Sequence, residues 1–548
     1  MHKTALLGAL LVVLLASGCS KKEHTAKDYS ADGTPAFGAT FVQASIGEAS
    51  NLIPWLATDT ASHDVSGMIY PSLLKYDKDL NLAPYLAESW EVSPDGLSLT
   101  FHLRKNAVWE DGQPVTAADV MASYQTIIAP STQTPYAEKY KLVTHADTPD
   151  AYTFRVTYAA PFAPALASWA ELSILPKHKL DACPDLMACD LKRQPLGTGP
   201  YKLLSWQSGK EIELTARHDH FEHRPYIERV RTRLITDLDA QFLELKTGRI
   251  DSMGLKPVQY AKLTDSDAFT RRYAKYNYLG NNYVYLGFNL NNSLFTDKRV
   301  RQALSFATPR DALVKGVLLG YGIASAGPFK PGTWAADDTL KPYPYDVDKA
   351  NQLLSAAGWI DTDGDGIRDK DGNPFSFTVV TNQGNDQRIK TAEIMQFTFR
   401  QVGVDMHIRV QEWATFIENT INKRQFDAFI LGWQLTPEPD PYDIWHSSKT
   451  GPREFNIINY KNADVDRLIE AARNTFDQTE RKKYYAQFQQ ILYDEQPYLF
   501  LYTPLTLTAL HKRFKGVVPA PAGLMYNFID WYVPAEQQIY TPQTAMVP

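Results

Sequence analysis

The sequence predicts an α/β protein of two or three domains, and three observations lead to this fold class. First, the chain has 548 residues, which is too long for one ordinary hydrophobic core. Second, several short segments of its first half alternate apolar and polar residues, which predicts half-buried strands. Third, from about residue 283 to residue 500, strand-like and helix-like patterns follow one another, which is typical of α/β domains.

The first half of the chain gives five strand signals and three helix signals. We expect strands at Phe37–Ser45, Leu97–Leu103, Tyr152–Tyr158, Ile212–Thr215 and Arg229–Leu234, and helices at Ser62–Tyr70, Thr116–Tyr124 and Thr236–Lys246. Thr116 is a suitable N-cap, and Asp119 stands near the positive end of the helix dipole. The glycine- and proline-rich run 197–201 marks a domain boundary.

The second half alternates the two kinds of element. We expect strands at Tyr283–Leu290, Phe375–Thr381, Asp405–Gln411 and Phe426–Trp433, and helices at Thr296–Ala307, Asp348–Ala357, Gln387–Val402 and Ala414–Asn422. Thr296 is the expected N-cap of the first of these helices.

The N-terminus has the pattern of an export signal. Lys3 precedes an apolar run of about 12 residues, Ala5–Ala16, which is shorter than the ~20 that span a membrane. Cys19 follows Ala-Ser-Gly, which resembles a bacterial lipobox, although Ala16 stands where Leu is usual. We therefore expect a lipoprotein signal peptide at 1–18, a lipidated Cys19 and a flexible stalk at 19–36. The alternative is an ordinary cleaved signal with a chance cysteine.

Composition narrows the class of partner. The chain has 62 Asp and Glu against 56 Lys and Arg, and no basic stripe mixes with aromatic residues, so we expect no nucleic-acid partner. Its 30 Tyr, 25 Phe and 11 Trp exceed what is usual, and a binding cleft uses Tyr and Trp because they combine an apolar ring with a polar tip.

Two further cysteines, Cys183 and Cys189, are six residues apart. An exported compartment is oxidising, so we expect a small disulfide loop, and the alternatives are two free thiols or half of a metal site.

One loop repeats the oxygen spacing of a calcium site. The acidic positions that would bind calcium are Asp361, Asp363, Asp365 and Asp369. The bidentate acid usual at the twelfth position is replaced by Gly372, so bound calcium and an empty acidic turn both stay open, in either case away from the ligand site.

Five ordered segments resemble one family closely. They are Leu82–Trp90, Leu97–Trp109, Asp111–Val120, Pro195–Tyr201 and Phe295–Leu304. The chain is identified by them as similar to the oligopeptide/dipeptide-binding (peptide/nickel) class of ABC-transporter solute-binding proteins, from about Phe37 into the C-terminal region.

This resemblance implies a two-lobed periplasmic-binding-protein clamshell with an extra third domain. We expect lobe one at 37–76, 194–282 and 501–548, the extra domain at 77–193, and lobe two at 283–500. Ligand binding would close the lobes about a hinge.

The resemblance also implies which residues touch the ligand. Trp413 matches a Trp that lines a side-chain pocket, with Ile417 one turn later, and Trp433 matches a Trp that flanks the ligand. Tyr285 matches a cleft tyrosine, and Thr60 falls in a segment that pairs with a peptide backbone. For each of these residues the alternative is core packing.

The chain departs from the family just after Trp433. An Asp three residues later binds the peptide ammonium in well-known members, but here Gln434 and a leucine lead to Thr436. Glu438 or Asp440 would have to reach that ammonium instead. Otherwise the protein holds long peptides without gripping a terminus, or binds a solute that is not a peptide.

The predicted function is capture of a peptide, or of another small solute, outside the cytoplasm. The resemblance implies delivery to an ABC permease with cytoplasmic ATPases, a lipid anchor in a bacterial membrane, and a monomer that requires no cofactor beyond the calcium considered above. The alternatives are a sugar or a nickel complex as ligand, or a peptide chaperone or sensor without transport. We expect no enzyme, because no nucleophile, carboxylate pair or metal motif is indicated.

Overall fold

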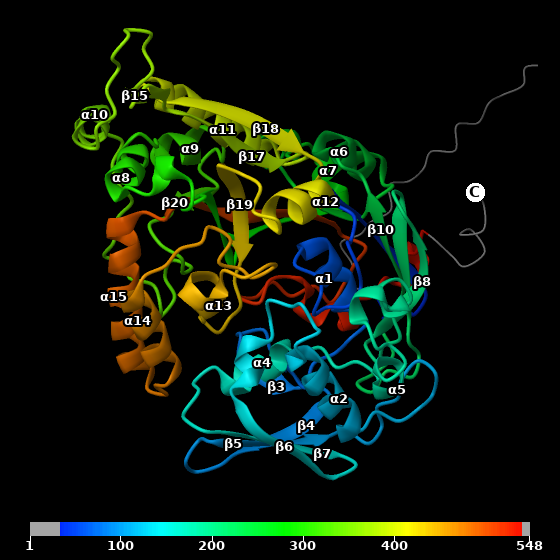
Figure 1. The fold of residues 1–548 in the computed structure, drawn as a ribbon. Helices are drawn as coiled ribbons and strands as arrows, with labels where there is room; N and C mark the ends of the chain where they lie inside the picture. Colours follow the sequence, from blue (N-terminus) through cyan, green and yellow to red (C-terminus); the bar gives the residue numbers. More distant parts are fainter. Residues whose placement is uncertain (1–32, 540–548) are drawn as a thin grey trace, which may run out of the picture.

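The computed structural model describes residues 33–539, so the predicted signal peptide, Cys19 and most of the predicted stalk lie outside the described residues. The names lobe one, extra domain and lobe two are used below for the ranges expected from the sequence. In Figure 1 the extra domain, drawn mainly in blue to cyan, forms a smaller unit at the lower end of the molecule.

One long strand, β20 (Tyr498–His511), joins the two lobes. Its first part pairs with β13 (Asn282–Phe288), a strand of lobe two, and its last part pairs with β11 and β12 of lobe one. The resulting sheet has 12 strands, ten of them in the order β18-β17-β19-β13-β20-β11-β1-β10-β9-β8, while β12 and β14 pair with β20 outside this path. The expected lobe boundary at residues 500 and 501 therefore falls inside a continuous strand.

Lobe one is assembled from segments far apart in the sequence. Its other strands are β1 (Ala39–Ser45), β8 (Tyr201–Gln207), β9 (Glu211–Ala216), β10 (Ile227–Leu234), β11 (Ser252–Gly254) and β12 (Tyr273–Leu279), and its helices are α1 (Thr60–Ser66), α6 (Leu238–Thr247) and α7 (Asp267–Arg272). A buried ion pair ties these segments together. Arg513 Nη2 lies 2.7 Å from both carboxylate oxygens of Asp251, which also accepts a bond from the Val42 amide.

The extra domain has a four-stranded antiparallel sheet in the order β4-β5-β7-β6. Its strands are β4 (Ala87–Val92), β5 (Ser98–Leu103), β6 (Val143–Asp150) and β7 (Thr153–Tyr158), beside the hairpin of β2 (Leu74–Tyr76) and β3 (Leu82–Pro84). Its helices are α2 (Ala117–Ile128), α3 (Glu138–Lys141), α4 (Ala165–Glu171) and α5 (Lys177–Leu180). As expected, Thr116 is the N-cap of α2 and Asp119 lies in its first turn. The Thr116 amide donates to the Asp119 carboxylate at 2.8 Å.

Lobe two carries helices around its part of the large sheet. Its further strands are β14 (Gly322–Ala324), β15 (Asp369–Lys370), β16 (Asn373–Pro374), β17 (Ser376–Asn382), β18 (Asp405–Gln411) and β19 (Ala428–Gln434). Its helices are α8 (Lys298–Phe306), α9 (Arg310–Gly316), α10 (Val347–Ala356), α11 (Asp386–Arg400), α12 (Trp413–Thr415), α13 (Tyr442–Trp445), α14 (Ala463–Arg473) and α15 (Gln478–Glu495). In Figure 1, α14 and α15 lie side by side at the left edge.

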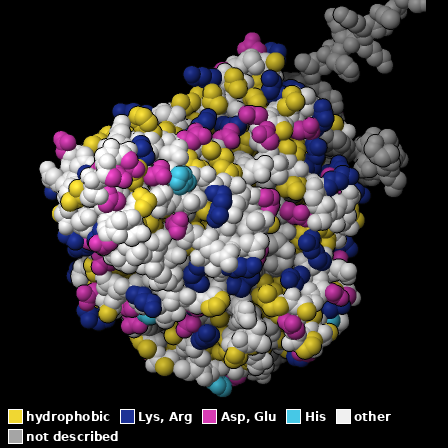
Figure 2. Space-filling view, turned by 45° about the horizontal axis from the view of Figure 1, so that its top comes forward, with side chains coloured by type: hydrophobic (Ala, Val, Ile, Leu, Met, Phe, Trp, Pro, Cys, Tyr) yellow, Lys and Arg dark blue, Asp and Glu magenta, His cyan; other side chains and the backbone are white. Residues whose placement is uncertain are grey.

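Every strand and helix expected from the sequence has a counterpart, with two differences of detail. Asp297, and not Thr296, caps α8, because its carboxylate accepts from the Arg299 amide at 2.9 Å. The helix expected at Ala414–Asn422 divides into the short α12 and a π-helical segment, Phe416–Ile421. Basic and acidic side chains are interspersed on the face of the molecule drawn in Figure 2.

Candidate ligand-binding cavity

A cavity of about 1030 Å³ lies where the three parts of the chain meet. Residues from lobe one, the extra domain and lobe two all line it, for example Trp55, Tyr136 and Trp433. This volume is at the upper end of the ~300–1000 Å³ that is usual for small-molecule sites. The cavity can therefore hold a ligand larger than a single amino acid.

Three of the predicted contact residues form apolar walls of the cavity. Trp413, Ile417 and Trp433 all line it. The Trp433 indole lies edge-on to the Phe455 ring, with centroids 5.2 Å apart, and its Nε1 donates to the Tyr498 hydroxyl at 3.4 Å. The ring of Trp413 packs tightly against Gly47 of lobe one. A larger residue would not fit at that position, because a Cβ atom added to Gly47 would lie only 2.6 Å from the ring.

Tyr285 is placed differently from the expectation. It is fully buried and does not line the cavity, because it lies in the core behind Trp433, with parallel rings 6.4 Å apart. Its neighbour on the same face of β13, Tyr283, reaches the cavity instead. The Tyr283 hydroxyl itself is buried and has no hydrogen-bond partner among residues 33–539.

Three polar residues of the prediction also line the cavity. Thr60 is the first residue of α1, Gln434 is the last residue of β19, and Thr436 follows two residues later. The Thr436 hydroxyl donates to the backbone carbonyl of Glu438 at 2.8 Å, which shapes the loop after β19.

Glu438 and Asp440 line the cavity but already have cationic partners of their own. Arg473 holds both Asp440 oxygens, with its Nη2 at 2.6 Å from Oδ2. Burial alone would raise the pKa of Asp440, but Arg473 beside it keeps that pKa below its usual value. Arg481 forms an ion pair with Glu438. Burial nevertheless raises the pKa of Glu438 above its usual value. Both carboxylates thus line the cavity with a cationic partner already in place, and contact of either with a ligand ammonium stays a prediction.

A third carboxylate, three residues after Asp440, was not anticipated from the sequence. Asp443, on α13, lines the cavity, and its buried Oδ1 atom accepts no hydrogen bond from the described residues. Burial raises its pKa, and the nearby Asp440 adds to that rise, while Arg473 opposes it. The Asp-Pro-Tyr-Asp sequence was the only signal that could have suggested it.

The rim of the cavity is closed by contacts between the parts of the chain. A segment of lobe two, 447–456, supplies three of them. Lys449 lies 3.6 Å from the Glu138 carboxylate of the extra domain, and Arg453 Nη2 donates to the Leu56 carbonyl of lobe one at 3.0 Å. Phe455 meets the ring of Tyr136 edge-on, with centroids 5.3 Å apart. The structure is therefore a closed form of the cleft.

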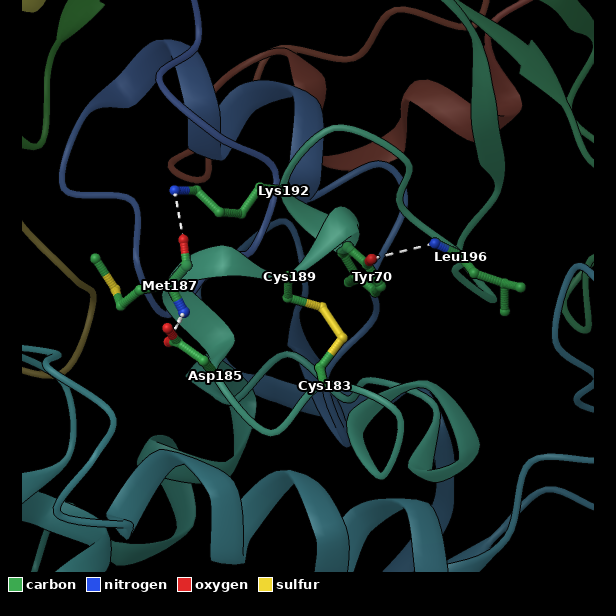
Figure 3. The surroundings of a disulfide bond; sticks show 7 residues. All are labelled: Tyr70, Cys183, Asp185, Met187, Cys189, Lys192 and Leu196. Carbon is green, nitrogen blue, oxygen red and sulfur yellow. Dashed lines mark hydrogen bonds between the residues drawn. A yellow bond between two sulfur atoms is a disulfide. The ribbon is translucent and has the colours of Figure 1, made fainter.

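Cys183 and Cys189 form a disulfide, with sulfur atoms 1.98 Å apart, close to Tyr70 and Lys192 (Figure 3). In the sequence, the disulfide lies between α5 and the second segment of lobe one, which begins at residue 194. Because the two sulfur atoms are bonded to each other, neither is available as a metal ligand.

The predicted calcium loop lies at the hairpin of β15 and β16, and none of its residues lines the cavity. Carboxylate oxygens of Asp361, Asp363 and Asp369 lie within 4.8 Å of one another, while Asp365 accepts from the Ile367 amide. The Asp361 oxygens accept bonds from the loop's own amides. Bound calcium stays a prediction.

Comparison with known proteins identifies the family. The sequence model of the bacterial extracellular solute-binding proteins, family 5 (middle part), matches residues 81–454. The chain belongs to this family. Its members form a solute-binding class and are described as extracellular, which implies an extracytoplasmic location. Among residues 33–539, no helix is both long and apolar enough to cross a membrane.

Several relatives are similar over nearly their whole length. The oligopeptide-binding protein AppA of Bacillus subtilis is 34% identical, over 97% of this chain and 99% of AppA. The structure of AppA with a nonapeptide matches with a TM-score of 0.87 and 33% identity, over 91% of this chain and 100% of that chain. NikZ from Campylobacter jejuni, solved with Ni(L-His), matches with a TM-score of 0.82 and 27% identity, over 90% and 99% of the two chains. The two-lobed α/β fold is thus the fold of solved solute-binding proteins.

Proposed function

We propose that this protein captures peptides in the described cavity and delivers them to an ABC permease. The observation that carries the proposal is the similarity to AppA over nearly the whole of both chains, since AppA was solved with a nonapeptide. The size of the cavity supports it, because about 1030 Å³ exceeds what a single amino acid requires.

The lining of the cavity suits a ligand of variable sequence. Aromatic side chains such as Trp413 and Trp433 cover apolar surface of many shapes, and polar tips can bond a peptide backbone. A peptide bound in extended form uses its main chain for affinity, which does not depend on its sequence. Closure about the strand β20 would then be favoured by whatever ligand contacts both lobes.

Four further features belong to the proposal. The mature chain would be held at a bacterial membrane by lipid on Cys19, would act as a monomer, and would need no cofactor, with calcium at most a structural ion. It would carry out no chemical reaction, since capture and release require only different affinities in the open and closed forms. The ATPases that power import would belong to the permease.

A nickel complex is the second candidate, because NikZ was solved with Ni(L-His). The cavity of this chain offers little for a metal: His63 is the only histidine that lines it within residues 33–539, and its Nε2 is engaged with the Ala57 carbonyl at 3.0 Å. A sugar is a third candidate. Neither is favoured by a specific contact.

Native mass spectrometry of the soluble chain from Lys21 onward, followed by denaturing analysis of the bound material, tests the proposal. Heterogeneous peptide masses are the expected result. A single non-peptide solute, or a nickel complex, would refute peptide capture. Uptake of a labelled peptide by membrane vesicles that contain the cognate permease then separates import from a chaperone or sensor role, because only an importer moves the label inside.

A further inference from the structure

A group of contacts joins the two lobes beside the cavity, and we call it the interlobe seam. In each contact the first residue belongs to lobe one and the second to lobe two. The contacts are Gly47 with Trp413, Thr236 with Gly384, and Lys256 with Asp386. Of these six residues, only Trp413 lines the cavity. The seam therefore joins the lobes largely at positions that a ligand does not fill.

The seam lies on the side of the lobes that faces the cleft. In lobe one, Gly47 and Thr236 each come two residues after the end of a strand, and these strands, β1 and β10, are parallel neighbours. In lobe two, Gly384 and Trp413 hold the same places after the parallel strands β17 and β18. Ligand clefts in α/β folds form at the carboxyl ends of parallel strands. Opening the cleft therefore separates the residues of the seam.

The lobes approach each other most closely at Gly384. A Cβ atom at this position would lie only 2.5 Å from the carbonyl oxygen of Thr236, and the φ angle of Gly384 is +82°. Both observations favour glycine, which has no side chain and adopts positive φ freely. The backbone of lobe two can thus come close enough to lobe one for side chains beside Gly384 to bond across the seam.

Lys256 supplies the cation of the seam from lobe one. Its side chain is only 9% exposed and bonds two carboxylates: Asp239 of lobe one, at 2.7 Å, and Asp386 of lobe two. Lobe one holds the first two residues in place by itself. The Lys256 amide donates to Gln259 Oε1 at 2.9 Å, and the Gln259 side-chain amide donates to Asp239 at 3.0 Å. Closure therefore has only to bring Asp386 to a lysine that is already positioned.

Asp386 supplies the anion from lobe two. It stands in the first turn of α11, whose N-cap Asn385 accepts from the Arg388 amide at 3.0 Å. Its side chain is 41% exposed, and Lys256 is its only ion-pair partner among residues 33–539. The positive end of a helix dipole favours an acid at this place. Asp386 is therefore stable in water when the cleft is open, and closure adds a bond to it.

We infer that Lys256 and Asp386 form a latch that stabilises the closed form without touching the ligand. This inference rests on the proposed capture of peptides by closure of the lobes, and it assigns part of the affinity to residues outside the cavity. A bond made only in the closed form shifts the open–closed equilibrium equally for every ligand. The latch residues are positioning residues: they slow release of any peptide and do not select among peptides.

The test compares two synthetic nonapeptide mixtures, one with a single Lys and no acidic residue, the other with a single Glu and no basic residue. Calorimetric titration gives the affinity, and stopped-flow fluorescence of the cavity tryptophans gives the mean rates. In Lys256→Met we expect both mixtures to bind about threefold to thirtyfold more weakly, as is usual for loss of a partly exposed charged bond. The loss should lie in faster dissociation, with the association rate changed by less than about twofold.

Matched variants separate the latch from other effects of charge. Asp386→Asn should reproduce the loss seen in Lys256→Met, and the double variant should lose no more than either single one. Lys275→Met is the control for the lysine, because Lys275 pairs with Asp265 inside lobe one whether the cleft is open or closed. Asp348→Asn, which removes an exposed acid from the first turn of α10, is the control for Asp386. Both controls should leave affinity within about twofold of the parent chain.

A melting scan checks that each variant folds. Lys256→Met leaves Asp239 without its cation and can lower the stability of lobe one, so Asp386→Asn is the deciding variant. It removes a charge that is partly exposed even in the closed form, and we expect the unliganded variant to melt within about 2 °C of the parent chain.

The other outcomes overturn the inference. Unchanged affinity in Asp386→Asn would refute the latch and leave peptide capture intact. A loss confined to one of the two mixtures would make the substituted residue a ligand contact. Losses that add in the double variant would show that Lys256 and Asp386 do not act as a pair. Binding of neither mixture by the parent chain would refute peptide capture and, with it, the inference that rests on it.

Discussion

The pairing of Asp440 with Arg473 leads to a prediction about stability. The variant Asp440→Asn keeps the shape of the side chain but removes the charge that faces Arg473, whose side chain is only 5% exposed. Arg473 also stacks on the Tyr442 ring at 3.7 Å, and its carbonyl accepts from the Ala163 amide of the extra domain. The guanidinium therefore cannot swing out to solvent without losing its stacking on the Tyr442 ring.

The expected cost follows from this burial. Removing one partner of a buried ion pair destabilises a protein by about 3–5 kcal/mol, because the other charge is left without compensation. For a cooperative unit of 150–250 residues, each kcal/mol shifts the melting temperature by about 2–4 °C. We therefore expect Asp440→Asn to lower the melting transition that includes lobe two by about 6–20 °C.

Differential scanning calorimetry of the unliganded protein measures this shift. The matched control is Asp348→Asn, an exposed acid in the first turn of α10, which should change the melting temperature by less than about 2 °C. The reasoning would be refuted if Asp440→Asn melted like the parent chain and only bound peptide less tightly, since Asp440 would then be a ligand contact and not the support of Arg473.

Three further predictions concern the cavity and the disulfide. Trp433→Ala should weaken binding of a synthetic nonapeptide mixture at least about tenfold in calorimetric titrations, because buried aromatic anchors carry much of an interface's affinity. Reducing the Cys183–Cys189 bond should lower the free energy of unfolding, measured in urea, by about 2 kcal/mol, as expected for a loop of seven residues. Burial raises the pKa of Asp443, so whatever its negative charge adds to the affinity for a cationic peptide should be lost as the pH falls through that raised pKa.

Each of these predictions has its own control. Phe397→Ala removes an aromatic ring that is 67% exposed on α11 and should leave affinity unchanged. The control for the disulfide is a double Cys→Ser variant, which should unfold at the same urea concentration with and without reductant. It should also unfold at the urea concentration at which the reduced parent chain unfolds. This result would exclude other effects of the reductant. An N-acetylated peptide without Lys or Arg should show little loss of affinity over the same pH range. Equal losses for both peptides would exclude Asp443 as the titrating group.

The fold could be predicted well because most of its elements have one apolar face. β5 and β7 alternate buried and less buried residues along their length, which is the pattern that the sequence analysis used. The long β20 was missed because its first part is buried on both faces, so that apolar residues follow one another without alternation. The cap of α8 was misplaced by one residue, because both Thr296 and Asp297 can accept from a backbone amide and only the backbone path decides between them.

The cavity was harder to predict than the fold. Trp413 and Trp433 were found through the resemblance to a family, but Tyr285 was assigned to the cavity in place of Tyr283. Both tyrosines lie on the same face of β13. Which of them is covered depends on side chains from other parts of the chain, so the sequence of the strand alone does not decide it. The partners of Glu438 and Asp440 lie 43 and 33 residues later, so no local pattern indicated that these carboxylates were already paired.

The assembly of lobe one from distant segments has a consequence for how the protein forms. Arg513 bonds the carbonyl of Thr40 and the carboxylate of Asp251, and 473 residues separate Arg513 from Thr40. At the usual synthesis rate of ~5–20 residues per second, β1 waits roughly 25–95 s before the chain that locks it has been made. The extra domain and most of lobe two are complete earlier. A chain that ends before Arg513 would therefore lack a finished lobe one, whatever the state of its other two parts.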